Sequence, residues 1–211
     1  MDRAKGIDVS HHNTQDVSAD WDAVLGSGVS FVGIKTSQGN TFTDPMFGVN
    51  QIQVRARPFD FVTYYHFAAP GDPVAQAEHF TGLVGELQPN ERVCLDLEDD
   101  KTGKPAVDLI WASTFYGSLM RGVCTDRKPL LYTSRRVWLQ LGNPTWDMAS
   151  DVDLWAPRYG PDAPELPLPW KPYGWKFWQF SEDGEVPGIH GKCDVSYFNG
   201  DVAALQAYAQ L

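Results

Sequence analysis

Short apolar segments alternate with longer amphipathic segments along most of the chain. The apolar segments are rich in Val, Ile, Leu and aromatic residues, which is typical of buried strands, and the amphipathic ones predict helices that cover a sheet. The predicted strands are Gly6–Val9, Phe31–Thr36, Phe59–Phe67, Val93–Glu98, Pro129–Tyr132, Leu154–Ala156, Trp175–Phe180 and Cys193–Phe198. The predicted helices lie near Trp21–Leu25, Pro45–Ala56, Val74–Leu87, Val107–Cys124, Arg135–Leu141 and Asp201–Tyr208.

Helices separate the first five or so predicted strands, whereas loops join the last few. Six prolines fall between Pro157 and Pro172, which is too many for a helix, so this segment is expected to be a shaped loop. We find no internal repeat and no Gly/Ser-rich linker. The pattern therefore predicts a single α/β domain over residues 1–211, an irregular TIM-like barrel with degenerate helices in its second half.

Composition narrows the class of protein. The chain has 27 acidic and 17 basic residues, and this net charge of -10 disfavours binding to nucleic acid. Cys94, Cys124 and Cys193 form neither a disulfide framework nor a zinc-binding pattern. No segment is apolar enough to cross a membrane, and the first residues contain no signal-peptide pattern, so we expect synthesis in a cytoplasm without membrane insertion.

The segment VCLDLEDD, residues 93–100, carries the clearest candidate chemistry. Alternation along a strand sends Val93 and Leu95 to one face and Cys94, Asp96 and Glu98 to the other, which in a barrel faces the axis. Asp96 and Glu98 then lie about 7 Å apart at Cα, at the strand end where barrel enzymes build their active sites. Such close carboxyls allow one to stay protonated while the other is ionised, as glycoside hydrolysis requires. An acidic strand end that leads into a solvated turn is the alternative.

Two further acids fall inside predicted strands, where Asp is disfavoured. Asp8 lies in the first strand and Asp194 in the last, and these strands are neighbours in a closed barrel, so the two side chains could converge. Lys35 ends the second strand and is either a site residue or a solvated lysine. Aromatic and amide side chains near other strand ends would line a sugar groove or belong to the core, namely Tyr65, Phe67, Tyr132, Trp155, Trp178 and Gln179.

The segments GIDVSHHN, FVGIKTSQG, YYHFAAP, AQAEHF, VCLDLEDD, PLLYTS, DLWAPRY, KFWQFSEDGEVPGI and KCDVSYFNG follow one another along the chain. In this order they resemble glycoside hydrolase family 25, the Chalaropsis-type lysozymes, which include many phage endolysins. The resemblance covers about Gly6 to Asp201. It implies a barrel of five β/α units followed by three strands, and hydrolysis of the β-1,4 bond between N-acetylmuramic acid and N-acetylglucosamine in bacterial peptidoglycan.

The same resemblance implies roles for particular residues. The family's Asp-x-Glu motif corresponds to Asp96 and Glu98. The family's first-strand and last-strand aspartates correspond to Asp8 and Asp194, and its site lysine corresponds to Lys35. The Tyr-His-Phe segment falls on Tyr65, His66 and Phe67, and strand parity then sends Tyr64 and His66 to the opposite face. Glu98 is the expected general acid, and Asp96 is expected to stabilise the anomeric centre or hold the acetamido group.

The resemblance also sets expectations for the whole molecule. We expect a monomer that needs no cofactor or metal and has no wall-binding module. It would be a phage endolysin, or a secreted enzyme if a signal peptide has been removed. Two rival functions remain: a metal-dependent phosphodiesterase that uses the four carboxylates as ligands, and a non-catalytic peptidoglycan-binding protein.

Overall fold

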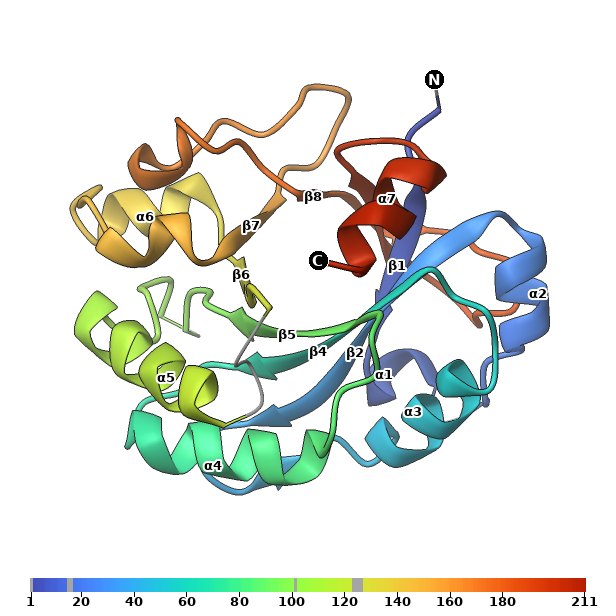
Figure 1. Cartoon of the computed structure of the whole chain (residues 1–211), viewed down its shortest axis with the longest axis horizontal. Helices are drawn as coiled ribbons and strands as arrows, with labels where there is room; N and C mark the ends of the chain where they lie inside the picture. The colour runs from blue at the N-terminus through green and yellow to red at the C-terminus, as the bar shows by residue number, and fades with distance from the viewer. Residues whose placement is uncertain (1, 15–16, 101, 123–126) are drawn as a thin grey trace.

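The computed structural model of the chain is a barrel of mostly parallel strands with helices around its outside (Figure 1). It describes residues 2–14, 17–100, 102–122 and 127–211. The strands are β1 (Lys5–Val9), β2 (Val29–Gln38), β3 (Phe42–Thr43), β4 (Phe61–Phe67), β5 (Glu91–Asp96), β6 (Leu130–Tyr132), β7 (Asp153–Pro157), β8 (Phe177–Gly184) and β9 (Cys193–Phe198). The α-helices are α1 (His11–Thr14), α2 (Trp21–Gly26), α3 (Phe47–Arg55), α4 (Pro73–Val84), α5 (Leu109–Arg121), α6 (Arg135–Gln140) and α7 (Val202–Ala209), and the 3-10 turns are η1 (Asp147–Ser150) and η2 (Leu168–Trp170).

The sheet closes on itself. Its hydrogen-bonded order is β1-β9-β8-β7-β6-β5-β4-β2, and the additional pairing of β1 with β2 completes the ring. Strand β9 is antiparallel to both of its neighbours, whereas the other barrel pairs are parallel. The two-residue strand β3 extends β2 as a hairpin outside the ring. The α/β barrel predicted from the sequence is therefore confirmed.

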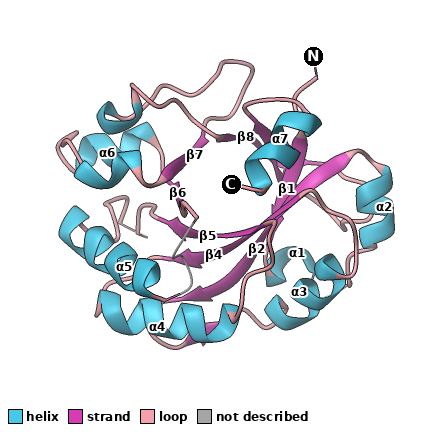
Figure 2. Cartoon of the chain, viewed as in Figure 1, coloured by secondary structure: helices cyan, strands magenta, loops and turns pink. Residues whose placement is uncertain are grey.

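Helices are unevenly distributed around the ring. An α-helix follows each of β1, β2, β4, β5 and β6, but residues 153–198, which are all described, contain only the single 3-10 turn η2. In Figure 2 the connection between β7 and β8 is mostly a long loop. The prolines of this segment explain the difference, because they lack the N–H groups that a helix needs. None of the described helices is long and apolar enough to cross a membrane.

Side chains on the barrel strands alternate between two hydrophobic clusters, as the sequence pattern predicts. Val93, Leu95 and Leu97 belong to the layer between the strands and the helices. Cys94 belongs to the cluster inside the barrel, which consists mainly of large aromatic side chains. Helix α7 adds Leu205 to this inner cluster and closes the amino-terminal end of the barrel. The opposite end, where the parallel strands finish, is left for the site.

Several boundaries differ from the predicted ones. Strand β5 ends at Asp96, so Glu98 lies just beyond the strand instead of within it. The four-residue helix α1 and the hairpin strand β3 were not predicted, because both are too short to produce a periodic pattern. Cys94 and Cys193 are buried free thiols. Cys124, where helix α5 was predicted to end, lies outside the described residues.

Candidate active site

A cavity of about 280 Å³ opens at the carboxyl ends of the barrel strands. We refer to it as the catalytic cavity. It contains ten of the eleven side chains that the sequence singled out as site residues. Its full lining is Asp8, Ser10, Lys35, Tyr65, Phe67, Cys94, Asp96, Glu98, Tyr132, Trp155, Tyr159, Gln179, Glu182 and Asp194. Barrel closure brings these residues together from strands that are far apart in the sequence.

Asp8 and Asp194 face each other across the β1–β9 pair, as strand adjacency predicted. Gln179 of β8, the strand on the other side of β9, holds Asp8 in place. Its Nε2 donates to Asp8 Oδ2 at 3.0 Å, and its Oε1 accepts from Tyr132 Oη at 2.7 Å. Gly33 leaves space for the side chains of Asp8 and Trp155. A Cβ atom at this position would lie 2.9 Å from the Cβ of Asp8 and 2.8 Å from the ring of Trp155.

Asp8 and Asp194 form a carboxyl pair in which both groups have a raised pKa. Burial raises the pKa of Asp8 well above its usual value, and the charge of Asp194 and the hydrogen bond between the two carboxyls raise it further. Burial also raises the pKa of Asp194, to about 6, although the hydrogen bond from Asp8 lowers it. The pair therefore retains a proton to a higher pH than two separate aspartates would.

Asp96 and Glu98 form the second carboxyl pair. Burial raises the pKa of both, the charge of Glu98 raises that of Asp96 further, and the Lys35 ammonium lowers both. The Tyr132 hydroxyl also lowers the pKa of Glu98. Asp96 Oδ1 is buried and has no hydrogen-bond partner among the described residues. The pair thus retains a proton to a higher pH than isolated carboxyls would, and Asp96 Oδ1 offers a buried acceptor to a ligand that carries an N–H or O–H group.

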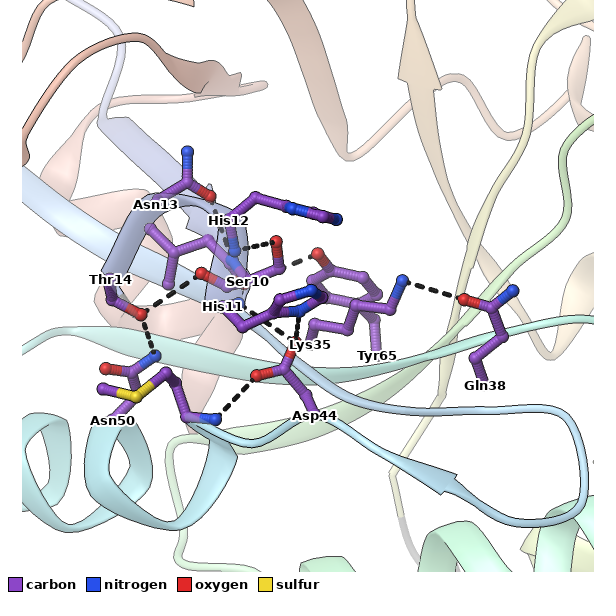
Figure 3. Close-up of polar contacts among 12 residues, drawn as sticks. Ser10, His11, His12, Asn13, Thr14, Lys35, Gln38, Asp44, Asn50 and Tyr65 are labelled. Atoms are coloured by element: carbon purple, nitrogen blue, oxygen red, sulfur yellow. Dashed lines mark hydrogen bonds and ion pairs between the residues drawn. The ribbon is translucent and has the colours of Figure 1, made fainter. Parts of the chain in front are cut away.

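Lys35, Tyr65 and Phe67 line one side of the catalytic cavity, and Figure 3 shows Lys35 and Tyr65. The Lys35 ammonium lies 5.0 Å from the centre of the Phe67 ring and donates to Gln38 Oε1 at 3.2 Å. The Tyr65 hydroxyl donates to the carbonyl of Val9 at 3.4 Å. Tyr64 and His66 point to the opposite face, where His66 is buried between Ser37 and Gln76. The family resemblance, combined with strand parity, predicted this division.

A buried aspartate outside the predicted set positions the end of β1 (Figure 3). Asp44 Oδ2 accepts from the backbone N–H of His11 at 3.0 Å and lies 2.7 Å from its Nδ1, while Oδ1 accepts from Met46 N–H at 2.9 Å. This anchor holds the turn directly after Ser10, which lines the catalytic cavity. The sequence contained no signal for it, because the partners are 33 residues apart.

Comparison with known proteins identifies the family. The family model for glycosyl hydrolases family 25 matches residues 7–189. The chain belongs to glycosyl hydrolases family 25. It is 30% identical to Lysozyme M1 of Streptomyces globisporus over 97% of this chain and 71% of that protein. It is 26% identical to the N,O-diacetylmuramidase of Chalaropsis sp. over 97% of this chain and 98% of that protein.

A solved structure supports the same assignment. The bacterial lysozyme from Streptomyces coelicolor superposes with a TM-score of 0.88 at 28% identity, covering 100% of this chain and 98% of that one. The family 25 chain described here is therefore a glycoside hydrolase, and its carboxyl cluster lies at the end of the barrel where enzymes of this architecture act.

One predicted site residue of this family 25 enzyme lies elsewhere. Trp178 does not line the catalytic cavity, which corrects the sequence prediction. Its neighbour Gln179 points into the barrel, so alternation sends Trp178 to the outer layer, where its ring lies 6.0 Å from those of Trp175 and Tyr197. Its Nε1 donates to the carbonyl of Arg158 at 2.7 Å. Trp178 thus stabilises the loop after β7 from the outer layer of the barrel.

Four side chains of the catalytic cavity were not among the predicted site residues, namely Ser10, Cys94, Tyr159 and Glu182. Tyr159 comes from the proline-rich loop, where no periodic pattern tells which side chains turn inward. Glu182 lies in β8, whose register against β9 shifts after Gln179 and again after Ser181. These bulges break the alternation on which the sequence prediction relied.

Substitution of Asp194 is expected to stabilise the fold near neutral pH. Because its pKa is raised from 3.8 to about 6, the folded protein holds a proton that the unfolded chain has released. The contribution of Asp194 to the free energy of unfolding is therefore most favourable below pH 4 and is lost as the pH rises through 6. Asp194→Asn removes this penalty, on the order of 2 kcal/mol, and should raise the melting temperature at pH 7 by about 4–8 °C.

Thermal melts at pH 7 and pH 4 measure this difference, which should largely vanish at pH 4. The exposed Asp183→Asn provides the control and should shift the melting temperature by no more than about 1–2 °C. A lower melting temperature for Asp194→Asn than for the wild type at pH 7 would contradict the account.

Proposed function

We propose that the protein is an N-acetylmuramidase that hydrolyses the β-1,4 bond between N-acetylmuramic acid and N-acetylglucosamine in bacterial peptidoglycan. One observation carries the proposal: Asp8, Asp96, Glu98 and Asp194, all with raised pKa, line a single cavity in a family 25 glycoside hydrolase. Two of its relatives are a lysozyme and an N,O-diacetylmuramidase by name.

Glu98 is assigned as the general acid. It lies just beyond the end of β5, at the mouth of the barrel, and burial raises the pKa of its carboxyl. A protonated carboxyl there can donate to the glycosidic oxygen of the leaving sugar. The resulting carboxylate then takes a proton from the attacking water in the second half of the reaction.

Asp96 is assigned to the acetamido group of the reacting sugar. Its buried Oδ1 offers an acceptor to the acetamido N–H, and such a bond favours the ionised form of Asp96. The proton of the Asp96–Glu98 pair then resides on Glu98, where acid catalysis needs it. Substrate binding would in this way set the protonation state of the pair.

Asp8, Asp194 and Gln179 are assigned to positioning and electrostatic support. Their hydrogen bonds join one side of the catalytic cavity to Tyr132, which lies beside Asp96 in the β5–β6 pair. Lys35 balances part of the negative charge of the Asp96–Glu98 pair. Tyr65, Phe67 and Trp155 supply ring faces against which a sugar can pack.

The raised pKa values of its four carboxyl groups suit the catalytic cavity to acid–base chemistry. Among the described residues, no group of three or more His, Cys, Asp and Glu side chains has an arrangement suited to a metal ion. Cell-wall targeting, an endolysin origin and a monomeric state are part of the proposal and rest on the family resemblance.

Release of reducing ends from purified peptidoglycan should continue in a strong chelator, at a rate within about twofold of the untreated enzyme. The reason is that the four carboxyls act here as acid, base and orienting groups. Loss of the activity in EDTA with rescue by Mg²⁺ or Ca²⁺ would mean that the carboxyls hold a metal ion and would contradict this acid–base assignment. Cleavage of a phosphodiester instead of the glycan would favour the phosphodiesterase. Binding to the wall without any release of reducing ends would favour the non-catalytic protein.

A further inference from the structure

A second hollow of about 280 Å³ adjoins the catalytic cavity on the side of β6 and β7. The two share Glu98, Tyr132 and Tyr159, so Glu98 lies at the boundary between them. Asp8, Asp96 and Asp194 all lie on the first side of this boundary. A ligand long enough to cross Glu98 therefore occupies both spaces.

Asp99 gives the second hollow a buried acceptor. Its side chain is 10% exposed, and its Oδ2 forms an ion pair with Arg136 of α6. Its Oδ1 is buried and has no hydrogen-bond partner among the described residues. The backbone at this point is held firmly, because Asp99 bridges to Pro105 and the Glu98 carbonyl accepts from Ala106 N–H at 3.0 Å. A fixed and unpaired carboxylate oxygen of this kind fits a ligand that donates a hydrogen bond.

The position of Glu98 tells which part of the substrate reaches this hollow. A general acid must lie between the sugar that reacts at its anomeric carbon and the sugar that leaves. The reacting sugar belongs with Asp96, which is assigned to its acetamido group. The leaving sugar then extends past Glu98 into the second hollow, where the ring of Tyr159, which is 51% exposed, provides an apolar face.

We propose that the second hollow binds the leaving N-acetylglucosamine and that Asp99 Oδ1 accepts a hydrogen bond from it. Arg136 holds Asp99 in place and is a positioning residue. The inference rests on the proposed function and assigns the leaving-side contact within it. It predicts that Asp99 affects only substrates in which a sugar follows the cleaved bond.

The test compares two substrates. One is a glycan strand of peptidoglycan, and the other is a GlcNAc–MurNAc glycoside with an aryl leaving group, which places no sugar in the second hollow. Asp99→Ala should lower kcat/KM about tenfold on the glycan strand, mainly through KM, because it removes a hydrogen bond to a charged group. The same variant should change kcat/KM on the aryl glycoside by less than about twofold at the pH optimum. Because the charge of Asp99 raises the pKa of Glu98, the alkaline limb should move to lower pH by the same amount on both substrates.

Two further variants sharpen the comparison. Arg136→Ala, at a side chain that is 66% exposed, should lower kcat/KM on the glycan strand about threefold without threatening the fold. Asp162→Ala removes an exposed carboxylate that pairs with another arginine of the second hollow, Arg158, and should leave both substrates unaffected. This control separates the contact of Asp99 from a simple loss of charge near the cavity.

Equal losses of kcat/KM on both substrates at the pH optimum would mean that Asp99 acts through Glu98 and would overturn the subsite. An unchanged kcat/KM on the glycan strand would overturn it as well. Neither result would affect the proposed muramidase activity. Failure of the wild-type protein to cleave either substrate would overturn the proposed function and this inference with it.

Discussion

Glu98→Gln is expected to lower turnover on peptidoglycan at least about a hundredfold while the protein stays folded. Glutamine has nearly the same shape as glutamic acid but cannot donate a carboxyl proton, and general acid catalysis contributes 10²–10⁴ in rate. The side chain lies at the boundary of two adjoining spaces and can reach a bond held across them. Initial rates of reducing-end release measure the turnover, and thermal melts measure whether the variant stays folded.

The matched control is Glu185→Gln. Glu185 is an exposed carboxylate that pairs with Lys192 outside the catalytic cavity, and its substitution should change turnover by less than about twofold. Near-normal turnover of a folded Glu98→Gln protein would remove Glu98 from the role of general acid.

The second large effect concerns the substrate. A glycan from which the acetyl groups have been removed is expected to react at least about a thousandfold more slowly than the native glycan. Asp96 and Glu98 both come from the end of β5 and so approach the sugar from one side of the barrel mouth. A simple inverting enzyme or a retaining enzyme with a protein nucleophile needs carboxyls that flank the reacting bond.

The geometry of Asp96 and Glu98 fits a reaction in which the acetamido oxygen of the substrate is the nucleophile. Its attack displaces the leaving sugar, to which Glu98 gives a proton, and water then opens the cyclic intermediate. Two displacements at one carbon give net retention, so the first product should be the β anomer. Early-time NMR of the new reducing end measures this, and an α anomer that appears first would reject the mechanism.

Most of the site could be predicted from strand alternation and barrel closure. Alternation placed Asp96 inside the barrel. For the strand with Tyr65 and Phe67, alternation left two faces open, and the family resemblance selected the face that puts His66 outside. Closure placed Asp8 beside Asp194, although they lie at opposite ends of the chain. These predictions succeeded because each depends on local parity or on the adjacency of the first and last strands, and neither requires the loops to be known.

The remaining site residues depend on irregular structure. Tyr159 lies in a proline-rich loop, and Glu182 follows a bulge in β8, so neither occupies a position that a period of two can predict. Trp178 was predicted together with Gln179, although adjacent residues on a strand point to opposite faces. The anchor between His11 and Asp44 is a tertiary contact with no local pattern.

The most direct test of the account is mass spectrometry of wall fragments released by the wild-type enzyme and reduced with borohydride. Hydrolysis after N-acetylmuramic acid converts that sugar into its alcohol at every new reducing end. The account predicts muramic alcohol at these ends and intact stem peptides attached to it. Glucosaminitol at the new ends would contradict it, and so would fragments cut only within the peptides.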